Sequence, residues 1–534
     1  MPKITEPSLV RNGEDGPSTV EAARAQILDR THALMAFALA QAEGDTTFAG
    51  FEQDLGGKLV GLARAVVVLF LVAYDQRVRR SLGDRVVRDG RTFRWAPAQP
   101  RNLLTWFGVV RYGRAYLREV VDLGKPARGF HPLDAALGLL ADRISPNVLS
   151  VAVRLATRMP YAVARDLLGW FLPVAPSTEV IESAVLGYGS STQEWFEVAP
   201  APADDGEVLI IQGDGKGVPT ATDEELKKRR GKRSRKRKTP SPRHRGRQTR
   251  GRRTKKPRRK KGDKAKNAKM GTMIVMYTLR KQPGGPLLLG PINKRYYASF
   301  GSKRHAIEVA RREATKRGFG PDTKKLVQVL TDGDNDLARY VGELFPNALH
   351  TVDVMHVIEK LWDAGSSIHR EGSPECRAWV EEQKDALYAG KAAAIVAEFE
   401  QQLAQIAKTG PGNKYRREKL TEIGAYLAKR TANMNYHDLL ARDLELGTGA
   451  VEGAIKNKMG GRMDHGGMRW IKERAEALLQ LRCIDANGDW GAFMKHVHDK
   501  ARTHAIDKGV RVRIQRRQAA PLPCVAAEKL PVAA

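Results

Sequence analysis

The order of apolar and polar positions predicts an α/β core in the middle of the chain. Short apolar runs rich in β-branched residues indicate strands that are buried on both faces of a sheet. The strand candidates are residues 207–213, 272–279, 287–300, 326–331 and 350–353. Residues 301–317 and 337–345 between them have the apolar spacing of helices. We therefore predict a mixed sheet flanked by helices over residues 205–356.

The regions on either side of this core have mainly helical patterns. We expect a mainly α-helical N-terminal region over 21–195 and a second helical region over 357–440, rich in Lys, Glu and Ala. Residues 441–505 return to the core with a glycine-rich entry into a helix. Residues 1–20 and 506–534 lack an apolar period, so we expect a disordered N-terminus and a loose C-terminal tail.

The N-terminal region contains a predicted hairpin at 105–116 and a predicted helical unit at 145–189. Ser145 and Pro146 form a good helix start, because Ser caps a helix and Pro is tolerated in its first turn. Two short helices separated by a tight turn are the outline of a helix-turn-helix that reads DNA. Any packed helical hairpin gives the same pattern, and 178–189 lacks Lys and Arg, so both interpretations stay open.

Length and composition narrow the class of protein. A chain of 534 residues is long enough for several domains. Its three cysteines lie far apart without a C-x-x-C pair, which indicates neither a disulfide framework nor a cysteine zinc site. The N-terminus lacks the apolar core of a signal peptide, and the apolar run at 65–74 is too short to span a bilayer. We expect a cytoplasmic protein without a membrane partner.

The positive charge of the chain is concentrated in one segment. The formal net charge is +31, and residues 227–266, with 24 Lys or Arg against one acid, carry +23 of it. We interpret 223–268 as a disordered basic insertion in the core that grips phosphates non-specifically, and a solvated spacer is the alternative. The residues predicted to contact DNA here are Lys227, Lys228, Arg229, Arg230, Arg252, Arg253, Arg258, Arg259 and Lys260. We also predict DNA contacts for Arg462 and Trp470.

Three acids lie at positions where an α/β core of this kind would bind a ligand. Asp214 and Asp332 each follow an apolar strand and precede a glycine, and Glu452 lies in the first turns of a later helix. Ligands bind beyond the carboxyl ends of strands in open α/β sheets. Carboxylates suit hard divalent cations such as Mg²⁺, and two such ions clamp the attacking and leaving oxygens of a phosphoryl transfer. We predict that the three acids hold two metal ions.

Other acids compete for these roles. Asp334 and Asp336 are rivals of Asp332, but only Asp332 directly follows the strand. Glu445 and Asp464 are rivals of Glu452, but only Glu452 lies among small residues.

Asp353 and His356 are three residues apart and meet if a helix starts between them. For His356, both a supporting catalytic part and a purely structural one stay open.

Taken together, the motifs resemble bacterial insertion-sequence DDE transposases. They are GDGKG at Asp214, TDGDND at Asp332, D-x-x-H at Asp353, and GTGAVEG-x-IKNKM at Glu452 followed by GGRM and MRW. The Kra group is most similar, with kinship to Mutator-like transposases, and the resemblance runs from about residue 105 to 490. The long basic tract after Asp214 departs from a typical member.

The resemblance implies an RNase H-like catalytic core, with 357–440 as its insertion domain. It implies a metal-binding catalytic triad of Asp214, Asp332 and Glu452, supported by Asp353 and His356. The implied cofactor is Mg²⁺, as two ions that Mn²⁺ can replace. The implied partners are double-stranded DNA, both element ends and target, and further copies of the chain in a nucleoid-associated complex.

Two other classes of function remain open from the sequence. A nuclease or resolvase on the same core would cut DNA without joining it. A non-catalytic nucleic-acid-binding protein would use the basic tract with an inactive core.

Overall fold

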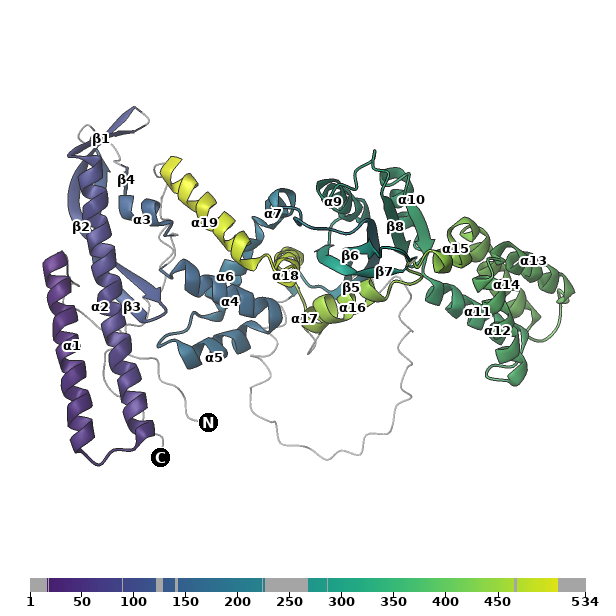
Figure 1. The fold of residues 1–534 in the computed structure, drawn as a ribbon, viewed down its shortest axis with the longest axis horizontal. Coiled ribbons are helices and arrows are strands. Elements are labelled where there is room, and N and C mark those ends of the chain that lie inside the picture. Colours follow the sequence, from purple (N-terminus) through teal and green to yellow (C-terminus); the bar gives the residue numbers. More distant parts are fainter. Residues whose placement is uncertain are drawn as a thin grey trace, which may run out of the picture. The chain divides into compact units, whose positions relative to one another are not determined.

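The computed structural model describes residue 17 and residues 19–88, 90–121, 128–139, 143–222, 224–225, 268–285, 287–464 and 468–507 (Figure 1). Its chain divides into two compact units. Unit 1 comprises residues 1–184 and 491–534, and unit 2 comprises residues 185–490. The last helix thus groups with the N-terminal unit, although sequence reasoning assigned residues 441–505 together to the core.

Unit 1 begins with a long helical hairpin followed by a small sheet. The hairpin consists of α1 (Val20–Glu43) and α2 (Phe48–Leu82), each capped by a threonine, Thr19 and Thr47. Within the described residues the sheet has the strand order β1-β2-β3-β4 and is antiparallel throughout. Its strands are β1 (Arg85–Arg88), β2 (Arg91–Thr105), β3 (Gly108–Glu119) and β4 (Gly129–Phe130). The turn of the predicted 105–116 hairpin lies between β2 and β3, which confirms that hairpin.

The core of unit 1 lies between α2 and this sheet. Val68, Leu71 and Val72 on one face of α2 pack against Leu103 and other apolar residues of the sheet. The apolar run predicted to be a buried helix therefore lies inside a longer helix. By length and composition alone α2 could cross a membrane, but these three side chains pack in the core of their own unit.

The predicted helical unit at 145–189 forms as separate helices with the expected boundaries. They are α4 (Pro146–Arg158), α5 (Tyr161–Phe171) and α6 (Thr178–Gly189). Ser145 caps α4 by accepting a hydrogen bond from the Val148 amide at 3.3 Å, as its sequence predicts. Whether these helices read DNA stays a prediction. Two further helices of unit 1 are α3 (Pro132–Leu137) and α19 (Trp490–Asp507).

Unit 2 is built on a mixed sheet, which confirms the predicted α/β core at this level. Among the described residues the sheet has five strands in the order β7-β6-β5-β8-β9. The strands are β5 (Val208–Pro219), β6 (Ala268–Lys281), β7 (Leu288–Ser299), β8 (Leu326–Thr331) and β9 (Leu349–Val352). β5, β6 and β7 form an antiparallel meander, while β8 and β9 run parallel to β5.

One prediction about β5 was wrong in its boundary. We expected the strand to end at Gly213, but it continues through Asp214 to Pro219. The reason is its antiparallel partner β6, which pairs with β5 over its whole length, whereas parallel β8 pairs with it only up to Gly213. Asp214 therefore lies within a strand, at the point where its parallel neighbour ends.

Helices flank both faces of this sheet (Figure 1). On one face α9 (Lys303–Lys316) and α10 (Asn335–Leu344) bury their apolar stripes against Leu209, Ile211 and Val329. The other face contacts α16 (Gly449–Ala454), the π-helical segment η3 (Ile455–Gly460) and α18 (Lys472–Ala486). The short helix α17 (Gly461–Met463) follows η3, and α7 (Thr192–Val198) contacts both α9 and α18.

The predicted helical region after the sheet is helical in the structure. Its helices pack on one another beside the end of the sheet that carries β9 (Figure 1). They are α11 (Val354–Ile368), α12 (Pro374–Tyr388), α13 (Ala392–Gln405), α14 (Asn413–Ala428), η2 (Thr431–Asn433) and α15 (Tyr436–Ala441).

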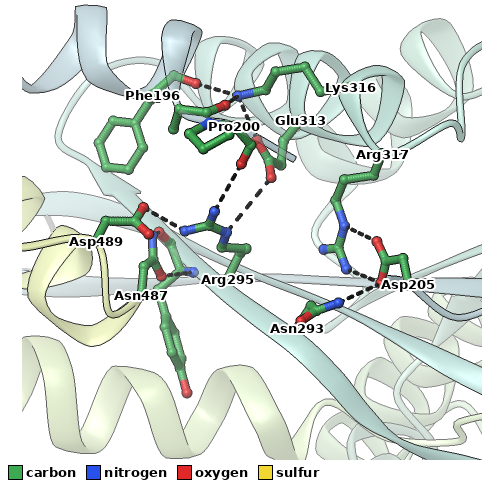
Figure 2. Close-up of polar contacts among 12 residues, drawn as sticks. Phe196, Pro200, Asp205, Asn293, Arg295, Glu313, Lys316, Arg317, Asn487 and Asp489 are labelled. Atoms are coloured by element: carbon green, nitrogen blue, oxygen red, sulfur yellow. Dashed lines mark hydrogen bonds and ion pairs between the residues drawn. The ribbon is translucent and has the colours of Figure 1, made fainter. Parts of the chain in front are cut away.

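A network of ion pairs joins β7 and α9 to the chain segments that enter and leave the core (Figure 2). Arg295 of β7 contacts Asp489 at 2.5 Å and Glu313 of α9 at 3.9 Å. Arg317 has a fully buried side chain and makes two hydrogen bonds to Asp205, at 2.7 and 2.8 Å. Burial raises the pKa of Asp205, but hydrogen bonds from Arg317 and Thr278 outweigh it and hold that pKa below its ordinary value. This network holds the segment just before β5 against β7 and the end of α9.

Candidate active site

The parallel strands place three aspartates side by side at one edge of the sheet. Gly213 pairs with Thr331, and Thr331 pairs with Val352. The next residue in each strand direction is Asp214, Asp332 or Asp353. Neighbouring strands lie about 4.8 Å apart, so these aspartates form one acidic row.

Glu452 reaches the same place from α16. Burial raises the pKa of Asp214, and the negative charges of Asp332 and Glu452 raise it further. A possible ligand atom of Glu452 lies within 4.8 Å of one of Asp353, the last aspartate of the row. The structure therefore brings Glu452 to the acidic row, although it is more than one hundred residues from Asp332 in sequence. Glu452 is exposed and Asp214 and Asp332 are half-buried, so solvent reaches the group.

A layer of buried amides beneath the acids holds the segment that carries Glu452. Gln212 precedes Asp214 by two residues and lies on the same face of β5. Its side chain accepts a hydrogen bond from the Val451 amide at 3.0 Å and donates to the Gly447 carbonyl at 3.2 Å. Gln212 thus links the strand of one acid to the helix of another.

Gln328 of β8 does the same one strand further along. It donates to the Glu445 carbonyl at 2.7 Å and accepts from the Glu445 amide at 3.2 Å. Tyr277 donates to the Glu445 carboxylate at 2.8 Å and accepts from Gln212 at 3.1 Å. Buried polar groups of this kind need partners, and here each group supplies one to the next. Sequence reasoning missed both glutamines.

Asp353 caps a helix and anchors a loop. Its Oδ1 accepts hydrogen bonds from the Met355 and His356 amides at 2.6 and 3.2 Å, so it is the N-cap of α11. Its Oδ2 accepts from the Thr448 amide at 2.5 Å and from the Thr448 hydroxyl. Burial raises the pKa of Asp353, but these bonds and the nearby His356 outweigh it and hold the pKa well below its usual range. Asp353 is ionised, and each of its two carboxylate oxygens accepts two hydrogen bonds.

Thr448 connects Asp353 to Glu452. Its hydroxyl lies within hydrogen-bonding distance of both carboxylates, 3.2 Å from Oε1 of Glu452. Asp353 therefore positions Glu452 through one intervening side chain.

His356 places a positive charge beside the acids. Its Nδ1 lies 3.7 Å from Oδ1 of Asp353, and that carboxylate raises the pKa of His356 to about 9. The charge of Asp332 also raises it, and His356 in turn lowers the pKa of Asp214. The predicted meeting of Asp353 and His356 is thus present, with a helix beginning between them.

The loop that carries Asp332 is held by the helical region. Arg430 follows α14, is buried, and donates to the Gly333 carbonyl at 3.1 and 2.5 Å and to Oδ1 of Asn335 at 2.7 Å. Its guanidinium lies 3.9 Å from the ring centroid of Tyr426, whose hydroxyl donates to the Asp332 carbonyl at 3.4 Å. Sequence reasoning missed Arg430 as well.

Gly333 allows this close approach. Its φ of +84° lies in the region that L side chains rarely adopt, and a Cβ there would lie 2.3 Å from the Tyr426 hydroxyl. The glycine after Asp332 is therefore required by both backbone conformation and packing.

The rival acids are engaged elsewhere. Asp334 caps α10 and pairs with Lys303, and Asp336 is exposed. Glu445 accepts the Tyr277 hydroxyl, and Asp464 pairs with Lys216 at 3.2 Å.

The predicted DNA contacts fall into two groups. The basic residues of 227–260 lie outside the described residues. Arg462 and Trp470 are both buried, with the guanidinium 4.9 Å from the indole ring. Their contact with DNA stays a prediction, and it would require this segment to open.

The described residues contain a group of possible metal ligands, but it is not the predicted triad. Asp353, His356 and Glu452 each bring one possible ligand atom within 4.8 Å of the others, and Asp214 and Asp332 are not in this group. The Asp353 oxygens already accept four hydrogen bonds, so Asp353 is poorly suited to bind a metal. Asp332 uses one oxygen for the Asp334 amide at 2.9 Å, and Asp214 uses one for the Gly215 amide at 2.5 Å. Asp214, Asp332 and Glu452 thus offer the oxygen ligands that Mg²⁺ prefers.

Comparison with known proteins gives no family for the chain, because no family model and no curated protein matches it.

Proposed function

We propose that the protein is a DNA transposase of a bacterial insertion sequence, with a DDE triad on an RNase H-like core. One observation carries this proposal: Asp214 and Asp332 follow neighbouring parallel strands at the same edge of the sheet, and Glu452 lies beside Asp353 after the next strand. Carboxylates gathered in this way repel one another unless a cation binds among them. The mixed sheet and the helical region inserted before Glu452 support the same class of core.

The reaction would be phosphoryl transfer on DNA. Bound Mg²⁺ would activate the attacking oxygen and stabilise the leaving oxygen. Asp214, Asp332 and Glu452 would hold two such ions. Gln212, Gln328 and Thr448 fix the segment that carries Glu452, and Arg430 fixes the loop that carries Asp332. His356 balances part of the negative charge.

The proposed partner is double-stranded DNA, as element ends and as target, bound by several copies of the chain in the cytoplasm. The basic tract would hold phosphates without reading sequence. Its charge of +23 predicts binding that weakens steeply with salt.

The test is cleavage of DNA that carries the sequences flanking the coding region, with Mg²⁺ or Mn²⁺. We expect Asp332→Asn to abolish cleavage while the protein still folds and binds DNA. Asp336→Asn is the matched control, because Asp336 lies four residues after Asp332, in the first turn of α10, but is exposed and lies 3.6 Å from Arg339. Cleavage by Asp332→Asn at the normal rate would exclude the assignment.

A second assay separates a transposase from a nuclease or resolvase. Pre-cut ends with a free 3′ hydroxyl are supplied together with a target plasmid. Joined products support the transposase, and cutting without joining supports the nuclease.

A further inference from the structure

The helical hairpin of unit 1 has an apolar face that nothing covers among the described residues. Seven large apolar side chains on α1 and α2 are between 45% and 76% exposed. They are Leu28, Met35, Leu39, Phe48, Leu59, Val66 and Phe70. Single exposed apolar residues are ordinary, but a continuous apolar patch of this kind marks an interaction site. We call these seven residues the hairpin face.

The seven side chains lie on one side of the hairpin. Leu28 and Met35 each follow a half-buried residue of α1, and Val66 follows buried Ala65 of α2. The helices run antiparallel, with Phe37 stacked on Phe51. In such a pair, the residue just after an inward-facing one points to the same side of the hairpin in both helices. The two apolar stripes therefore form a common surface.

The spacing along each helix is that of a coiled-coil seam. Leu28, Met35 and Leu39 are seven and four residues apart, and so are Leu59, Val66 and Phe70. Apolar residues at these intervals pack against another helix over a long distance. A hairpin with two such stripes presents half of a four-helix bundle.

The size of the surface suits a reversible dimer. The Phe37 and Phe51 stack places Leu39 level with about residue 49 of α2 and Leu28 level with about residue 60, so the two stripes lie side by side over about 12 residues, or about 18 Å. The α2 stripe alone continues for about 15 Å to Phe70. Two helices side by side are about 18 Å wide. The face thus covers roughly 450 Å² per copy and would bury roughly 900 Å² in a symmetric pair, which is the size of a weak, reversible interface.

The opposite side of α2 is already in use. Val68, Leu71 and Val72 pack in the core of unit 1, and Arg64 donates to the Phe107 carbonyl. A bilayer would have to surround α2 and break these contacts, whereas a second hairpin needs only the exposed side. A bilayer is therefore a poorer occupant than another copy.

We propose that the hairpin face is a dimer interface, on which two copies of this chain pack their α1 and α2 helices into a four-helix bundle around a twofold axis. A twofold axis suits this surface because the same apolar patch then serves both partners. This inference does not depend on the proposed function, and it predicts a dimer in the absence of DNA.

The test is sedimentation velocity of the full chain at micromolar concentrations, after nuclease treatment and in 0.5 M NaCl to exclude bridging by DNA. The native chain is expected to be a dimer. Met35→Glu combined with Val66→Glu places charges in the apolar seam and should raise the dimer dissociation constant by about 100-fold or more. Leu28→Glu combined with Leu59→Glu is a second pair with the same expected effect.

Val163→Glu is the control, because Val163 is 50% exposed but lies on α5, outside the hairpin face. It should leave the dimer unchanged, and circular dichroism should show all variants folded. The proposal is overturned if the native chain is monomeric or if both glutamate pairs leave the dimer intact. A monomer that instead binds phosphatidylcholine and phosphatidylglycerol vesicles through these residues would also overturn it, in favour of a membrane surface.

Discussion

Replacing Arg430 by methionine should disable the proposed metal site without touching any metal ligand. Arg430 donates three hydrogen bonds to the loop after Asp332, two to the Gly333 carbonyl and one to Asn335. Methionine fills a similar volume but leaves these acceptors unpaired. The two bonds to Gly333 share one acceptor, so two acceptors lose a hydrogen bond from a charged group. Each such bond contributes about 1.5–3 kcal/mol, so the loop conformation loses roughly 3–6 kcal/mol, less whatever water recovers.

Metal affinity reports this loss directly. Each 1.4 kcal/mol corresponds to a factor of ten in an equilibrium constant, so even half of the smaller figure weakens Mn²⁺ binding about tenfold, and the full amount weakens it by more than 100-fold. The measurement is a titration of the full chain with Mn²⁺, followed by electron paramagnetic resonance. Gly333→Ala should act in the same direction, because its Cβ meets the Tyr426 hydroxyl at 2.3 Å.

The matched control is Arg416→Met, since Arg416 lies on α14, the helix that Arg430 follows, but is exposed. It should leave Mn²⁺ binding unchanged. If Arg430→Met remains folded and binds Mn²⁺ as tightly as the native chain, the helical region does not position Asp332 and this reasoning is refuted.

Two further predictions concern stability. Asp205→Ala leaves buried Arg317 without its carboxylate and should lower the free energy of unfolding of unit 2 by about 3–5 kcal/mol. Asp204→Ala, which removes an 80% exposed partner of a surface ion pair, should cost less than about 1 kcal/mol, and equal melting temperatures for the two variants would contradict this. Burial, and then the charge of Arg430, lower the pKa of His350 from 6.5 to about 4. Below pH 6.5 the unfolded chain therefore binds a proton more readily than the folded chain. The free energy of unfolding should fall by up to about 3 kcal/mol as the pH is lowered from 6.5 to 4. The ratio of hydrogen-exchange rates in β8 and β9 between the native chain and His350→Gln should shift over this pH range, and a constant ratio would exclude the effect.

The strands and the acidic row could be predicted because each strand and the aspartate after it are marked by neighbouring residues. An apolar β-branched run followed by Asp marks both β8 and the start of β5, and the structure places these aspartates on adjacent strands. Period-two alternation also places Gln212 on the face of Asp214, so a search for polar residues two positions before each acid would have found this glutamine. Gln328 lies four positions before Asp332 and shares its face for the same reason.

Other features have no local signal. The extension of β5 past Asp214 depends on β6, which is more than fifty residues away in sequence. Arg430 contacts a loop 97 residues earlier, and nothing in the sequence around it indicates that contact. Arg462 looks like a surface cation in the sequence, yet it is buried, with its guanidinium 4.9 Å from the Trp470 ring. Such contacts are set by tertiary packing.

The central claim is that Asp214, Asp332 and Glu452 together form one divalent-metal site. Its most direct test is the number of Mn²⁺ ions that the full chain binds in solution, measured by electron paramagnetic resonance for the native chain, Asp332→Asn and Asp336→Asn. We expect two bound ions in the native chain and in Asp336→Asn, and loss of tight binding in Asp332→Asn. Equal binding by all three proteins, or no binding by the native chain, would contradict it.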